Sequence, residues 1–319
     1  MGYFIKKRDL LRFLDNLIAK HDIIAPVKRD IVRYERITSS KDLTLDFVNS
    51  IYPVKEYFLP VKETLFTFKD GKITVPHPDK GVVLFAIRPC DINAILRMDK
   101  LFLDECPDPY YALRREHNLI IGMSCTKAGE NCMCESFGTD KVSEGYDLLL
   151  TPSGDGYYAD VGSERGIKLI DKKLFKETDN VQNVNVHCEK KIPEEQVAKL
   201  KTSFNSSIWN EEADKCLSCS ACTMTCPTCG CFRVYDSPDV KPRSGCRLRE
   251  WTSCQLRNFT VVAGGHSFRD DRAMRLKNRI YHQLVYFKDK FDIQMCVGCG
   301  RCITNCPPKI DMSKIVNQL

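Results

Sequence analysis

The sequence predicts two structural parts: an α/β or α+β domain over residues 1–190 and a mostly helical domain over residues 191–319. The first part is predicted by the apolar run 81–87, which is typical of a strand buried on both faces and which a helical pattern follows. The second part is predicted by two runs of four cysteines, 216–226 and 296–306, between which helical spacing recurs. A chain of 319 residues has room for about two domains of ~150 residues.

The elements of the first part follow from apolar spacing and turn residues. Apolar side chains at helical spacing predict a helix over 8–20. Strands are expected at 23–27, 30–37, 63–68, 81–87, around 118–123, and at 146–150 and 157–161, the last two forming a hairpin. The turn after strand 81–87 places Asp91 where it can cap the next helix. A helix over 163–177 is expected to close this domain.

The second part is predicted to begin after a charged linker, 178–195. A helix near 194–206 leads into the first cysteine run. Two further helical patterns, 247–258 and 270–287, fill the interval between the cysteine runs.

The two cysteine runs share one spacing. Both read C-x2-C-x2-C-x3-C-P, and their cysteines are Cys216, Cys219, Cys222, Cys226 and Cys296, Cys299, Cys302, Cys306. Bacterial-type ferredoxins use this run for cubane 4Fe–4S clusters. Three thiolates two residues apart wrap one corner of the cube, whereas the fourth points away and ligates the other cluster. Proline then ends any helix at that point.

The crossed pattern predicts the two ligand sets of a dicluster ferredoxin-like domain. Cluster 1 takes Cys216, Cys219, Cys222 and Cys306, and cluster 2 takes Cys296, Cys299, Cys302 and Cys226. Gly298 and Gly300 carry no Cβ, so backbone amides can approach cluster 2 closely. The alternative is a pair of structural zinc knuckles, although zinc sites usually pair two C-x2-C elements rather than running four cysteines together.

A third 4Fe–4S cluster is predicted in the first part, held by Cys90, Cys125, Cys132 and Cys134. Cys90 and Cys125 each follow a predicted strand, and neighbouring parallel strands bring such residues to the same carboxyl edge of a sheet. Cys132 and Cys134 lie on the loop that Cys125 opens. Two alternatives stay open: buried cysteines at strand ends without metal, and a zinc site with the same ligands. Cys106 is the substitute if Cys90 is not a ligand.

The remaining cysteines have two interpretations. Four of them fall inside the second part, namely Cys229, Cys231, Cys246 and Cys254. They are either small buried hydrophobic residues or another metal site, whose C-x-C-x14-C-x7-C spacing matches no established ligand pattern. Cys106 and Cys188 are interpreted as structural.

Composition indicates a reducing environment. Eighteen cysteines in a chain without a signal peptide indicate metal ligation rather than disulfides. No run approaches the ~18 apolar residues of a membrane span. The expectation is a soluble cytoplasmic protein that needs anaerobic conditions.

The formal charge of +6 is offset by clusters that carry about −2 each. The lysines form no long run with interleaved aromatic residues, which argues against a nucleic-acid partner.

Stretches along nearly the whole chain carry a family resemblance. They are APVK (25–28), LPVKETLFTF (59–68), FAIRPCD (85–91), DPYYALRRE (108–116), CTKAGENCMCESFGTD (125–140), GYDLLLT (145–151), VGSERG (161–166), CPTCGC (226–231), WTSC (251–254) and CVGCGRC (296–302). In these stretches the chain resembles the 4Fe–4S dicluster electron-transfer subunits typified by the beta subunit of archaeal soluble sulfhydrogenase and by the corresponding iron–sulfur subunit of anaerobic sulfite reductase. The resemblance implies a hetero-oligomer, in which this subunit passes electrons between a flavin subunit that binds a nicotinamide and a separate catalytic subunit.

The sequence supports two functions of different classes. The first is a non-catalytic electron-transfer subunit of a hydrogenase, sulfite reductase or transhydrogenase type of complex. Because no G-x-G-x-x-G and no Walker lysine loop occurs, FAD and NAD(P) are expected on a partner. The second is a catalytic reductase subunit that acts on a small sulfur or disulfide substrate at a cluster with an open site, with Cys229 and Cys231 nearby.

Overall fold

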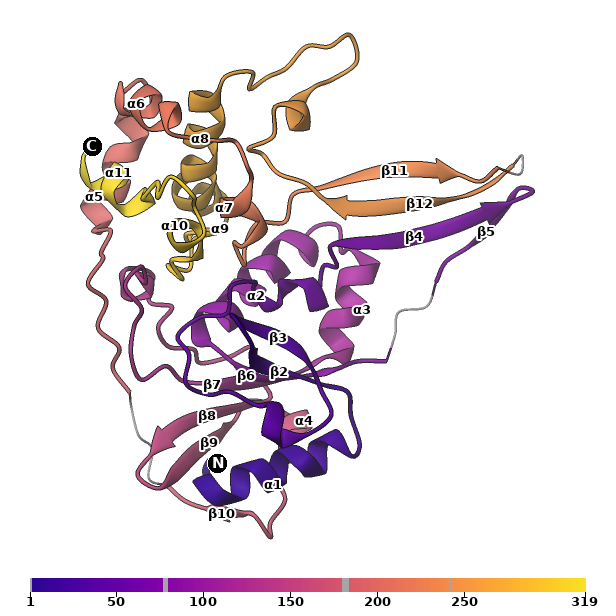
Figure 1. The fold of residues 1–319 in the computed structure, drawn as a ribbon, viewed down its shortest axis with the longest axis vertical. Coiled ribbons are helices and arrows are strands. Elements are labelled where there is room, and N and C mark those ends of the chain that lie inside the picture. The colour runs from indigo at the N-terminus through magenta and orange to yellow at the C-terminus, as the bar shows by residue number, and fades with distance from the viewer. Residues whose placement is uncertain (1, 77–79, 180–183, 241–242) are drawn as a thin grey trace.

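The computed structural model describes residues 2–76, 80–179, 184–240 and 243–319. Within these residues the chain forms an eight-stranded mixed sheet, a four-stranded antiparallel sheet and a group of C-terminal helices (Figure 1). Residues 180–183 of the predicted linker lie outside the described residues. None of the described helices has the length and apolar composition that a membrane crossing requires.

The large sheet organises the first part of the chain. Its spatial order is β10 (Phe175–Glu177), β1 (Gly2–Lys6), β9 (Gly156–Val161), β8 (Leu148–Ser153), β7 (Leu119–Met123), β6 (Val83–Ile87), β2 (Ile23–Lys28), β3 (Val32–Ile37). The central strands β2, β6, β7 and β8 run parallel, and the outer pairs are antiparallel. The predicted hairpin of β8 and β9 is therefore confirmed, and the mixed sheet agrees with the α/β or α+β class predicted for this part.

Strand β6 lies in the middle of two cores. Phe85 packs on one face with residues of α1 (Lys7–Ile18), whereas Leu84 packs on the other with residues of α2 (Pro89–Phe102) and α3 (Pro109–His117). Figure 1 shows α1 on one side of the sheet and α2 and α3 on the other. All five residues of β6 are buried, as the sequence predicted for a strand with two covered faces.

The small sheet joins both parts of the chain. Its order is β11 (Phe232–Pro238), β12 (Ser244–Trp251), β4 (Lys62–Lys69), β5 (Lys72–Thr74). In Figure 1 it projects as an arm beyond α3. The predicted helix over 247–258 is wrong, because β12 pairs along its whole length with β11 and β4. The mostly helical character expected of the second domain is accordingly not confirmed.

Short helices make up most of the remaining structure. They are α4 (Glu164–Ile167), α5 (Glu194–Lys199), α6 (Ile208–Asp214), α7 (Ala221–Met224), α8 (Arg272–Tyr281), α9 (Phe287–Phe291), α10 (Arg301–Thr304) and α11 (Met312–Asn317). A π-helical turn, His282–Tyr286, joins α8 to α9, and 3-10 turns lie at Ser40–Asp42, Val54–Tyr57, Cys134–Phe137, Leu200–Thr202 and Arg257–Thr260. The helices predicted over 194–206 and 270–287 are confirmed in shortened or interrupted form.

Two local predictions in the first part are wrong. The expected helix over 163–177 ends at Ile167, and residues 175–177 instead form β10 on the edge of the large sheet. Pairing with the distant strand β1 overrides the helical pattern there. Asp91 does not cap α2, which begins at Pro89 after Arg88. Its carboxylate instead pairs with Arg301, 210 residues away.

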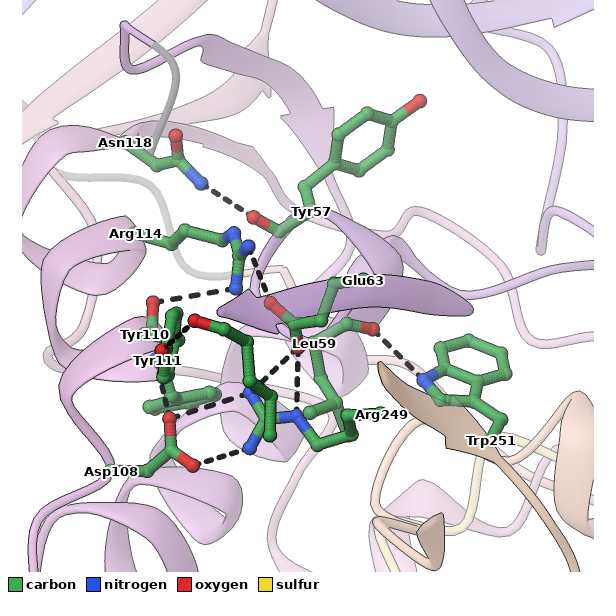
Figure 2. Close-up of polar contacts among 11 residues, drawn as sticks. Tyr57, Leu59, Glu63, Asp108, Tyr110, Tyr111, Arg114, Asn118, Arg249 and Trp251 are labelled. Atoms are coloured by element: carbon green, nitrogen blue, oxygen red, sulfur yellow. Dashed lines mark hydrogen bonds and ion pairs between the residues drawn. The ribbon is translucent and has the colours of Figure 1, made fainter. Parts of the chain in front are cut away.

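A buried charge network fixes the arm to the body. Arg249 of β12 lies opposite Glu63 of β4 in the register and donates to that carboxylate over 2.8 Å (Figure 2). Arg249 also donates to Asp108, the residue that caps α3, and Arg114 of α3 donates to Glu63 over 2.6 Å. The side chain of Arg249 is only 3% exposed. These contacts make the arm a rigid extension of the α3 surface.

Loss of Arg249 is predicted to destabilise this junction strongly. The variant Arg249→Met leaves the buried carboxylate of Glu63 and the partly buried carboxylate of Asp108 short of a partner, so the free energy of unfolding should fall by about 3–5 kcal/mol. Arg247→Met on the same strand is the matched control, because the Arg247–Asp236 pair is exposed and should contribute little. Denaturant unfolding measures both, and equal losses in the two variants would contradict the role given to the network.

Candidate metal centres

The cysteines predicted for cluster 1 surround one cavity. Cys216, Cys219, Cys222 and Cys306 all line it, together with Cys302 of the second run. Cys216 and Cys219 come from the loop that leads into α7, Cys222 lies in α7, and Cys306 follows α10. Among the described residues no three His, Cys, Asp or Glu side chains converge on a single ion site. Cys219 is exposed, which places this cavity at the surface.

The cysteines predicted for cluster 2 lie deeper. Cys296, Cys299 and Cys226 are buried, and Cys302 is half-buried. Burial raises the pKa of Cys299 to about 12, and nearby Cys226 and Cys302 act in the same direction. Cys226 and Cys302 likewise raise the pKa of Cys296, beyond the effect of its burial. The fourth cysteine of the first run therefore lies near the second run, as the crossed ferredoxin pattern requires.

The buried side chain of Arg279 suits a negatively charged group at the sites predicted for clusters 1 and 2. It is 5% exposed, lines the first cavity and donates from Nη2 to the carbonyl of Cys222 over 3.0 Å. Its Nε is buried without a hydrogen-bond partner among the described residues. Burial lowers the pKa of Arg279, but Cys222 and Cys302 hold it well above the usual value. A buried guanidinium requires a counter-charge, which metal-bound thiolates supply.

The edge of the large sheet brings together the four cysteines predicted for the third centre. Strands β6 and β7 are parallel neighbours, and Cys90 and Cys125 follow their carboxyl ends. Cys90, Cys125, Cys132 and Cys134 line one cavity, which also touches Cys299 of the second run. The predicted juxtaposition is thus present. A bulge at Ala86, where φ is 60°, lies just before the turn that carries Cys90.

The second cysteine run packs directly on the loop of the third centre. Met133 N donates to the carbonyl of Gly298 over 2.7 Å, and the Thr139 hydroxyl donates to the carbonyl of Val297 over 2.7 Å. A Cβ at Gly298 would lie 2.5 Å from the Met133 carbonyl carbon, and one at Gly300 would lie 2.2 Å from the Asn131 oxygen. The missing Cβ of these glycines was expected to let backbone amides approach cluster 2 closely. In the structure the missing Cβ leaves room for the neighbouring backbone of Asn131 and Met133.

A buried ion pair reinforces this contact. Arg301, which lies between Cys299 and Cys302, donates to both carboxylate oxygens of Asp91 over 2.7 Å. It also donates from Nε to the carbonyl of Ser50 over 2.8 Å. Arg301 and Asp91 are 2% and 1% exposed. Because Asp91 follows Cys90, the pair ties the second cysteine run to the third cavity.

Comparisons with known proteins support iron–sulfur clusters in the second part of the chain. A sequence profile of the 4Fe-4S dicluster domain family matches residues 215–310, which include both cysteine runs. The chain is 33% identical over 326 aligned positions to the sulfhydrogenase 2 subunit beta of Pyrococcus furiosus, and the alignment covers 96% of this chain and 95% of that protein. This chain belongs to the same dicluster family of sulfhydrogenase beta subunits. No solved structure gives a significant match.

Membership of this family establishes iron–sulfur chemistry for the C-terminal part, since the matched domain is a 4Fe–4S dicluster domain. The profile covers residues 215–310 only, so the third ligand set rests on geometry alone.

Burial raises the pKa of Cys222 to about 12 and that of Cys125 to about 11. These thiols therefore release protons when they bind metal, and iron loading is favoured at higher pH.

Sequence reasoning missed one side chain that lines the third cavity, Asn49, and one that lies beside its lining, Cys188. Asn49 donates to the carbonyl of Cys299 over 2.7 Å and approaches the sulfurs of Cys132 and Cys90 at 3.8 Å. Cys188, interpreted from sequence as structural, is fully buried with its sulfur 3.7 Å from that of Cys134. Neither residue lies in a motif, and only the folded chain brings them to the site. Cys106 is exposed and does not line the cavity.

One of the surplus cysteines of the second part lies apart from the other three. Cys229 donates a hydrogen bond that holds the pKa of Cys226 well below its usual value. A similar bond from Cys231 lowers the pKa of Cys254 to about 6. Cys246 lies apart from them on β12, opposite Thr67 of β4. Cys246 therefore does not join the other three in one site, whereas Cys229 and Cys231 both lie near Lys55 and Cys231 lies beside Cys254.

Gly298→Ala is predicted to disturb the packing of the second run on the third cavity. The residue has a positive φ of 61°, so alanine costs about 1–2 kcal/mol from backbone strain alone, and the clash with Met133 adds to it. Gly264→Ala is the control, because φ is 86° but no atom lies within 4 Å of the added methyl. Denaturant unfolding under anaerobic conditions should show the larger loss for Gly298→Ala. Equal losses would contradict the close contact.

Proposed function

We propose that this chain is the electron-transfer subunit of a cytoplasmic oxidoreductase complex, and that it holds three 4Fe–4S clusters in a row. The observation that carries the proposal is the position of the second cysteine run. Cys302 lines the first cavity, and Cys299 of the same run touches the third cavity. The three sites would therefore lie next to one another in space. Exposed Cys219 lies at one end of the row, and the edge of the large sheet lies at the other.

The residues around the sites suit an electron relay. Clusters, when bound, supply one-electron reduction and oxidation at potentials that burial and hydrogen bonds set. The chain excludes water from the middle site, where Cys296, Cys299 and Cys226 are buried. Arg279 and Arg301 supply buried positive charge. The hydrogen bond between Met133 and Gly298 and the ion pair of Asp91 with Arg301 fix the second cysteine run against the loop of the third site. No residue in this arrangement is required to break a bond of a substrate.

The partners follow from the family and from the absence of nucleotide motifs. We infer a hetero-oligomer in which a flavin subunit that carries FAD and binds NAD(P) stands on one side and a catalytic subunit on the other. The hydrogenase, sulfite reductase and transhydrogenase types of complex all fit this scheme. The relative from Pyrococcus furiosus is a subunit of a sulfhydrogenase, which supports the first type.

The catalytic alternative has less support. It requires a surplus cysteine beside a cluster and a path for a small sulfur or disulfide substrate. Cys229 is only 8% exposed, and its sulfur accepts a hydrogen bond from Gln283 over 3.6 Å. Turnover of polysulfide, sulfite or a heterodisulfide by the lone chain would favour this alternative over the relay.

Electron entry is predicted to depend on a partner. The full chain, purified anaerobically and reconstituted with iron and sulfide, should be bleached by dithionite but not by NAD(P)H. Addition of a purified flavoprotein that oxidises NAD(P)H should make NAD(P)H effective. Visible absorbance measures each reduction. Bleaching of the isolated chain by NAD(P)H would contradict the relay proposal, because it would require a nucleotide site on this chain.

Substitution of one cysteine is predicted to separate the third cluster from the other two. Cys132→Ser in the full chain should remove about four of about twelve irons and leave the remaining clusters in place. Cys106→Ser is the control, because Cys106 is exposed and lies away from the cavities. Iron and zinc per chain are measured by elemental analysis. Unchanged iron in Cys132→Ser, or zinc in place of the missing iron, would rule out a third cluster with this ligand.

A further inference from the structure

Besides Arg279 and Arg301, a third buried cation, Lys55, lies near the cysteines. Lys55 is 4% exposed, although lysine is almost never fully buried unless it is paired. It belongs to the 3-10 turn Val54–Tyr57 in the first part of the chain, far in sequence from both cysteine runs. Among the described residues no carboxylate lies within ion-pair distance of its Nζ, and adjacent Glu56 acts on the pKa of Lys55 less than the nearby cysteines do.

The contacts of Lys55 all come from the second part of the chain. Its Nζ donates to the carbonyl of Cys229 over 2.8 Å and to the carbonyl of Thr223 over 3.4 Å. It also lies 4.1 Å from the centre of the Trp251 ring. Trp251 is itself fixed, because its indole nitrogen donates to the carbonyl of Leu59 over 3.0 Å (Figure 2). The ammonium group is therefore held in one place.

These neutral contacts leave the charge of Lys55 without a counter-ion. Two carbonyls and one ring stabilise an ammonium group, but removing it from water costs several kcal/mol that a nearby negative charge must offset. Burial lowers the pKa of Lys55, and Cys229, Cys226 and Cys231, when they carry negative charge as thiolates, oppose that shift more strongly than Glu56 does. Of these, Cys226 is the predicted fourth ligand of cluster 2. A cluster with four thiolates carries about −2 and becomes more negative on reduction.

We propose that Lys55 is the buried counter-cation of the cluster that Cys226 helps to hold, and that its charge raises the reduction potential of that cluster. The inference rests on the proposed function. A fixed cation stabilises the reduced state more than the oxidised state, because reduction adds one negative charge, and poor solvent screening strengthens the effect. Lys55 is thus a positioning and tuning residue rather than a ligand.

Reduction potentials test the proposal in the reconstituted full chain. In an anaerobic titration followed by EPR, Lys55→Met and Lys55→Gln should both shift one reduction step to lower potential and leave the iron content at the wild-type value. Glutamine keeps a donor for the two carbonyls, so an effect shared by both variants reports the charge. Lys277→Met is the matched control. Lys277 also donates to a carbonyl and lies 3.7 Å over a ring, that of Phe204, but at the surface.

Each outcome decides the proposal. If both Lys55 variants keep the full iron content and the wild-type reduction potentials, the proposal is overturned. It is also overturned if Lys55→Gln alone keeps the wild-type potential. If both uncharged variants lose about four irons, the variant Lys55→Arg decides, because it restores the positive charge. Wild-type iron content in Lys55→Arg supports the role of Lys55 as a counter-cation, whereas continued loss of iron overturns it. A wild-type chain that binds no iron–sulfur cluster would instead refute the proposed function.

Discussion

The buried ion pair between Arg301 and Asp91 is the constraint on which the other sites depend. Arg301 belongs to the second cysteine run, and Asp91 belongs to the turn at the edge of the large sheet. Neither side chain can be left alone in the interior without a cost of about 3–5 kcal/mol. The pair therefore fixes the dicluster loops against the sheet edge, and the contact between Gly298 and Met133 follows from that placement.

Charge compensation explains why so many cations are buried near the cysteines. Arg279, Arg301 and Lys55 are each at most 5% exposed, and only Arg301 has a carboxylate partner among the described residues. Clusters that carry about −2 each would supply the missing counter-charge. The formal charge of +6 in the sequence equals the summed charge of three such clusters with opposite sign.

The sequence predicted the elements that local patterns determine. Strand β6, the hairpin of β8 and β9, and the approach of Cys90 to Cys125 all followed from apolar runs and the geometry of parallel strands. It failed where partners are distant. The residues of β12 looked helical because β4, nearly 190 positions earlier, is invisible to a local pattern. Cys188, Asn49 and Lys55 were missed for the same reason, since each reaches its site only through long-range packing.

The central claim is that three clusters lie in a row in this one chain. Anomalous diffraction at the iron edge, from crystals of the anaerobically reconstituted full chain, tests it most directly. Three separate iron peaks are predicted, within the cysteine-lined cavities beside Cys219, Cys296 and Cys132, with the middle peak between the other two. Two peaks only, or a zinc signal beside Cys132, would contradict the account.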